Sequence, residues 1–94
     1  MATVKVTLTF SASSATLRFV AYVDDTPLTI VNGKASPAPT LEQGVEHVVS
    51  WYVWGNGGDT LTITANNGSK DILNKSSAIP ASKTKSAGFA RIKP

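Results

Sequence analysis

Strict alternation of apolar and polar side chains is the feature that most restricts how this chain can fold. It is clearest near the N-terminus, where every second residue is apolar: Val4, Val6, Leu8 and Phe10. The residues between them are threonine or lysine. Successive side chains of a strand point to opposite faces, so the pattern predicts a strand with one buried and one solvated face. No segment of useful length has apolar residues at the i, i+3, i+4 spacing of a helix, and helices are therefore not expected.

Two further segments alternate in the same way. In the first, the predicted inward residues are Leu17, Phe19, Ala21 and Val23. The second runs from Val45 to Thr64 and contains both tryptophans and the single histidine; its predicted core residues are Val45, His47, Val49, Trp51, Val53, Leu61 and Ile63. Three glycines between residues 55 and 59 make a tight reversal easy, because glycine accepts positive φ. We therefore expect a strand pair joined by this turn.

Turn residues divide the rest of the chain into short segments. Asn32-Gly33 is the strongest hairpin signal, because a two-residue turn of this kind needs positive φ. Asp24 to Pro27 is expected to end the second strand, because Asp favours turns and Pro cannot donate to a strand ladder. Residues 74–82 are polar and include a proline, so we expect an irregular loop there, pinned by a buried Ile79.

Ala87 to Lys93 is expected to form the last strand, in which Phe89 and Ile92 cannot share a face without a bulge. The whole chain thus has six or seven short strands with turn signals about every ten residues. This arrangement fits one antiparallel β-sandwich domain over residues 1–94, of the immunoglobulin or fibronectin type III kind, and a small β-barrel is the alternative. Trp51 in a central strand resembles the core tryptophan of immunoglobulin-like sandwiches, although the flanking cysteines of that family are absent.

Composition excludes several classes of protein. The chain has no cysteine, which excludes disulfides and thiol chemistry. No apolar run approaches the roughly 18 to 20 residues that span a bilayer, and the alternating N-terminus does not have the form of a secretory signal peptide. We expect no membrane insertion, and the location stays open: cytoplasmic by default, or exported with the signal removed. The formal net charge is +3, with six of the nine basic residues and one acidic residue after position 69.

The aromatic residues opposite Trp51 are the main candidate for a functional surface. Val48, Tyr52 and Trp54 alternate with the core residues of the same strand, and Tyr22 is expected on the outer face of a neighbouring strand. Exposed apolar patches mark interaction sites, and Trp and Tyr are enriched at protein interfaces. We therefore predict a non-catalytic binding module whose partner is another protein or a second copy of the chain. The alternatives are a carbohydrate-binding domain using the same rings, or rings covered by the chain itself.

Other chemistries are less well supported. The polar turns offer oxygen ligands but match no calcium-loop spacing, so no metal site and no cofactor are expected. Nucleic-acid binding is not favoured, because the C-terminal basic residues are mostly lysines, with Phe89 as their single interleaved aromatic residue. No catalytic motif is present, and His47 is expected to be structural, at a strand start where its ring can reach solvent or a loop carbonyl.

Overall fold

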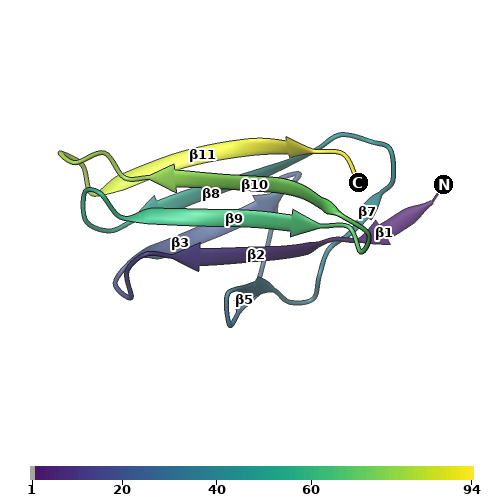
Figure 1. Cartoon of the computed structure of the whole chain (residues 1–94), viewed down its shortest axis with the longest axis horizontal. Coiled ribbons are helices and arrows are strands. Elements are labelled where there is room, and N and C mark those ends of the chain that lie inside the picture. Colours follow the sequence, from purple (N-terminus) through teal and green to yellow (C-terminus); the bar gives the residue numbers. More distant parts are fainter. Residues whose placement is uncertain (1) are drawn as a thin grey trace.

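The computed structural model describes residues 2–94 and shows a β-sandwich, with no helix among these residues (Figure 1). The strands, in chain order, are β1 Thr3–Lys5, β2 Thr7–Ala12, β3 Arg18–Val23, β4 Thr26–Pro27, β5 Ile30–Val31, β6 Lys34–Ala35, β7 Thr40–Glu42, β8 His47–Trp54, β9 Thr60–Asn66, β10 Asp71–Ala78 and β11 Lys85–Ile92. Six of them have six to eight residues, which agrees with the expected number of strands, and the other five are two- or three-residue pairings.

All strand pairs are antiparallel, and they form two main sheets. One sheet has the order β10-β9-β2-β6-β5 and the other has the order β11-β8-β3-β4, while β1 and β7 form a separate pair. Each main sheet ends in unpaired edge strands, so the predicted sandwich is confirmed and the barrel alternative is wrong. The immunoglobulin or fibronectin subtype stays a prediction.

The core lies between the two sheets and is built mainly from the alternating residues identified in the sequence. Val45 is the exception: it precedes β8 and is 39% exposed, so its predicted place in the core is wrong. Leu8, Trp51 and Ile63 are all at most 1% exposed. Phe10 of β2 and Phe19 of β3 stack across the core, with ring centroids 5.2 Å apart. Burial of such side chains from water is the main force that holds the two layers together.

The N-terminal alternation belongs to two strands. β1 pairs with β7, while β2 enters the five-stranded sheet between β9 and β6. Val6 lies between β1 and β2, and its backbone N–H donates to the carbonyl oxygen of Pro39 at 2.9 Å. The chain therefore passes from the β1–β7 pair to the five-stranded sheet at Val6, and the same alternate residues continue to face the core.

The expected strand pair across residues 55–59 is wrong. β8 pairs with β3 and β11, whereas β9 pairs with β2 and β10, so the turn crosses from one sheet to the other. Its backbone bonds to the loop after β10: Gly55 N–H donates to the Thr84 carbonyl, and Gly58 N–H donates to the Ile79 carbonyl. The apolar faces of β8 and β9 consequently meet across the core and do not lie side by side in one sheet.

The loop expected over residues 74–82 is also wrong in its first half. β10 continues to Ala78 and is paired along this part with β9, from Asn74 opposite Thr64 to Ala78 opposite Thr60. It is an edge strand that is largely solvent-exposed, so it lacks the apolar alternation that identifies a half-buried strand. Ile79 is buried as predicted.

Two hairpins have the expected turn chemistry. Asn32 and Gly33 have φ of 52° and 77° and join β5 to β6, which confirms the predicted hairpin. Asp24 and Asp25, at 49° and 66°, form a second two-residue turn between β3 and β4, where the sequence suggested only a break. Asp is one of the few residue types that tolerate positive φ, which explains its use at these positions.

β11 places Trp51 against a glycine. Gly88 lies opposite Trp51 in the β11–β8 register, and a Cβ at Gly88 would come within 2.8 Å of the indole. No bulge interrupts this register, because Phe89 and Ile92 lie on opposite faces of the strand. The Trp51 indole is thus held beneath the backbone of β11 and supports the sheet from the core side.

Candidate binding face

The outer face of the sheet β11-β8-β3-β4 brings together all four predicted site residues. We call it the aromatic face; its members are Arg18, Val20 and Tyr22 of β3, Val48, Ser50, Tyr52 and Trp54 of β8, and Lys85, Ala87, Phe89 and Arg91 of β11. These side chains point away from the core because the alternate residues of the same strands fill it. The location expected for Val48, Tyr52, Trp54 and Tyr22 is therefore the one observed.

The large apolar side chains of this face are not covered by the chain itself. Phe89, Tyr52 and Trp54 are 55%, 50% and 45% exposed, and Val20 and Val48 are also exposed. These five make up most of the large exposed hydrophobic residues in the described part of the chain; the other two, Val31 and Val45, lie elsewhere. The alternative that an edge strand or loop covers the rings is wrong for residues 2–94.

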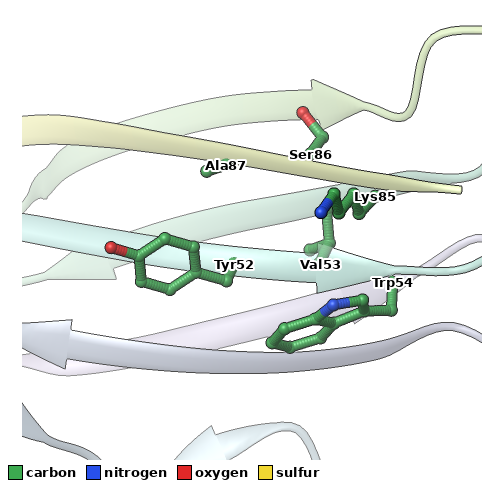
Figure 2. A pocket seen from close by; sticks show the side chains of 6 residues that line it. All are labelled: Tyr52, Val53, Trp54, Lys85, Ser86 and Ala87. Atoms are coloured by element: carbon green, nitrogen blue, oxygen red, sulfur yellow. The ribbon is translucent and has the colours of Figure 1, made fainter. Parts of the chain in front are cut away.

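Two of the rings contact each other directly. Tyr22 of β3 and Tyr52 of β8 meet edge to face, with ring centroids 6.1 Å apart and planes at 83°. Figure 2 shows the Tyr52 and Trp54 side chains on the same side of β8, with Lys85 of β11 close by. A shallow depression of about 400 Å³ lies along these residues and Ala87.

Charged residues lie around the apolar centre. Arg18 and Lys85 are opposite Trp54 on its two sides, at one end of the face. At the other end, Arg91 forms an exposed ion pair with Glu46 at 3.1 Å and lies 5.8 Å from the centroid of the Phe89 ring. An apolar centre with a charged margin is the usual composition of a protein interface.

The outer face of the other sheet has a different composition. In β2 and β9 the outward positions are Thr7, Thr9, Ser11, Thr60, Thr62, Thr64 and Asn66. The hydroxyl groups of Thr62 and Ser76 form a hydrogen bond across β9 and β10 at 3.1 Å. The sandwich can therefore present a polar outer face, and the fold itself does not require the rings on the aromatic face.

His47 links three segments beside the aromatic face. Its Nδ1 lies 2.5 Å from Asp24 Oδ2 and its Nε2 lies 3.0 Å from the Glu42 carbonyl oxygen. Because both partners are acceptors, the doubly protonated ring satisfies both bonds. The hydrogen bond to Asp24 raises the pKa of His47 and lowers the pKa of Asp24.

These contacts support a structural role for His47. The residue is buried, and both ring nitrogens are occupied, so neither is available to a nucleophile. Asp24 Oδ1 also accepts the Val48 backbone N–H at 2.9 Å, which fixes the β3–β4 turn to the start of β8. Within residues 2–94, no group of three His, Cys, Asp or Glu side chains is arranged to hold a metal ion. The same residues include no helix able to cross a membrane.

Phe89 is the main site residue that sequence reasoning missed. It has the highest exposed fraction among the large apolar residues and lies opposite Ser50, beside the Tyr22–Tyr52 pair. In the structure, Lys85, Ala87, Phe89 and Arg91 share the outer face of β11, and their position next to Tyr52 follows only from the pairing of β11 with β8. Comparisons of this chain with protein-family models, with curated proteins and with solved structures give no match.

Proposed function

We propose that this protein is a non-catalytic binding module that acts by protein–protein contact through the aromatic face. The observation that carries the proposal is the concentration of exposed rings on one sheet, while the central strands β2 and β9 of the opposite sheet present mainly threonine and serine to the outside. Each exposed ring leaves apolar area in water, which is unfavourable by roughly 25 cal/mol for every Å². Contact with a partner removes that cost.

The make-up of the face supports a protein partner. Tyr, Trp and Arg are the residues enriched at the energetically dominant positions of interfaces, and the face contains Tyr52, Trp54 and Arg91 among them. The rings are carried by paired strands over a packed core, so little conformational entropy is lost when they are covered.

Carbohydrate binding is the second candidate and we rank it lower. Sugar rings stack on flat aromatic faces, so an extended glycan would need rings that are parallel to the sheet and to each other. Tyr22 and Tyr52 are instead at 83° to one another. The polar edge formed by Ser50 and Asp25 beside these rings is the feature that favours a sugar.

A photo-cross-linking amino acid at Phe89 tests the proposal. Val31 is the matched control, because it is 51% exposed against 55% for Phe89 but lies on the other sheet. We expect the probe at position 89, and not the probe at position 31, to form protein adducts, either with the chain itself or with a protein of the source cells. Absence of protein adducts at position 89, with tryptophan fluorescence that responds to a glycan panel, would contradict the proposal and support the carbohydrate alternative.

A further inference from the structure

We propose that the protein bound by the aromatic face is a second copy of this chain, related by a two-fold axis that runs across the strands. This inference rests on the function proposed above and names its partner. The axis lies in the interface, over the line of residues Ala21, Trp51 and Gly88, which are cross-strand neighbours in β3, β8 and β11. Their side-chain positions face the core, so no outward side chain of these three strands lies on the axis itself.

The β-sheet register determines which outward residues such an axis brings together. Ala21, Trp51 and Gly88 are in register, so the axis crosses all three strands at the same level. A residue on one side of this level therefore faces, in the other copy, the residue of the same strand at an equal distance on the other side. The facing pairs, written as one copy against the other, are Trp54 with Val48, Tyr52 with Ser50, Phe89 with Ala87, and Tyr22 with Val20. In every pair a large ring meets a smaller side chain. Sheets packed face to face about 10 Å apart need this interdigitation.

This axis also brings opposite charges together where β3 of each copy begins and ends. Arg18 at one end faces the β3–β4 turn of the other copy, where Asp25 borders the depression beside Tyr22 and Tyr52. At the β11 ends Lys85 faces another basic residue, Arg91, and the ion pair between Arg91 and Glu46 reduces the repulsion. Opposite charges at an interface margin fix orientation and register.

A two-fold axis parallel to β8 is the other orientation, and it is unfavourable both for the packing of the rings and for the charges. It would place Trp54 against Trp54 and Tyr52 against Tyr52 at the centre of the contact. It would also place Lys85 against Arg18, because both are opposite Trp54 in the register. Two sheets with large rings directly over large rings cannot approach to the normal spacing.

The size of the face predicts a weak dimer. Three strands spaced about 4.8 Å apart, each contributing about seven residues at about 3.4 Å, cover roughly 14 by 24 Å. An interface of this extent is at or below the lower limit for specific complexes, so we expect a dissociation constant in the micromolar range.

Charge reversal at Arg18 and Asp25 tests the proposed axis. In a homodimer of Arg18→Glu, the introduced carboxylate of each copy faces Asp25 of the other. In a homodimer of Asp25→Lys, the introduced ammonium group of each copy faces Arg18 of the other. An equal mixture of the two variants restores both opposite-charge contacts in a heterodimer. Lys70→Glu is the control, because Lys70 is exposed in the β9–β10 turn of the other sheet.

The readout is mass by sedimentation equilibrium, with one variant isotopically labelled so that native mass spectrometry identifies the heterodimer. Wild type and Lys70→Glu should rise with concentration from 9.8 kDa toward twice that mass. Each reversal should weaken dimerisation at least about tenfold, and the mixture should recover it as heterodimer.

A wild-type chain that stays at 9.8 kDa up to about 1 mM would overturn the inference. A mixture with no more dimer than the separate variants would overturn the axis. If the chain is monomeric while the cross-linking probe at Phe89 captures a different protein, this inference fails and the proposed function stands.

Discussion

Tyr22 and Tyr52 lie on adjacent strands of one sheet and meet edge to face on its solvent side, with ring centroids 6.1 Å apart. The contact joins β3 to β8 outside the core and stabilises the orientation of both rings. It also defines the centre of the aromatic face, with Trp54 and Phe89 on either side. The rings are thus held in fixed positions before any partner arrives, which lowers the entropy cost of covering them.

The two tryptophans of β8 should respond very differently to truncation. Trp51→Ala removes a side chain that is 1% exposed, so we expect the free energy of unfolding to fall by about 3 to 5 kcal/mol. Trp54→Ala on the opposite face should change it by no more than about 1 kcal/mol, while abolishing self-association. Urea denaturation at low protein concentration checks the first quantity, and sedimentation checks the second. A large loss of stability in Trp54→Ala would show that its ring supports the fold.

Gly88 should not tolerate a side chain. An added Cβ would lie 2.8 to 2.9 Å from three atoms of the Trp51 indole, so either the ring or the β11 backbone must move. We expect Gly88→Ala to lower the free energy of unfolding by about 1 to 3 kcal/mol, the usual cost of overpacking. Ala87→Ser, on the solvent side of the same strand, is the control and should be nearly neutral. Equal melting temperatures for the two variants would contradict the proposed packing of Trp51.

The ion pair of His47 and Asp24 should make stability depend on pH in both directions. The folded state raises the pKa of His47 above its ordinary 6.5, so this contribution is complete below about pH 6.5 and is lost as the pH rises through the folded pKa. The folded state lowers the pKa of Asp24 below 3.8, so its contribution is complete above that value and is lost on acidification. The contribution of the pair is therefore greatest between about pH 4 and pH 6.5.

Asp24→Asn isolates this effect, because Asn tolerates the positive φ of the turn and keeps an acceptor oxygen for Val48. We expect the wild-type melting temperature to fall as the pH rises above about 6.5, and we expect Asp24→Asn to lose most of that fall. Asp25→Asn, the neighbouring change in the same turn, should retain the fall. A wild-type melting temperature that rises over this range would contradict the assignment of the doubly protonated ring.

The sequence predicts the core better than the connections. Alternation identifies Leu8, Trp51 and Ile63 as buried, because a sheet with one solvated face needs that period. It cannot identify β10, because an edge strand with water on most of its surface has no apolar period. It also cannot show that residues 55–59 cross between sheets, because a glycine-rich turn suits either connection and the partner strands are distant in the chain.

The sequence predicts only part of the binding face, because some of its strands are distant from one another in the chain. Val48, Tyr52 and Trp54 share a strand, so their common face follows from alternation alone. Phe89 lies some 35 residues further along the chain, and its position beside Ser50 depends on the β8–β11 pairing. Long-range register of this kind is set by the whole core and not by the local pattern.

Amide NMR spectra recorded over a dilution series test the central claim most directly. If two copies meet through the aromatic face, concentration-dependent shifts should be confined to β3, β8, β11 and the turn at Asp25, and Trp54→Ala should abolish them. Shifts that appear on the threonine-lined strands β2 and β9, or a spectrum that does not change with concentration, would contradict it.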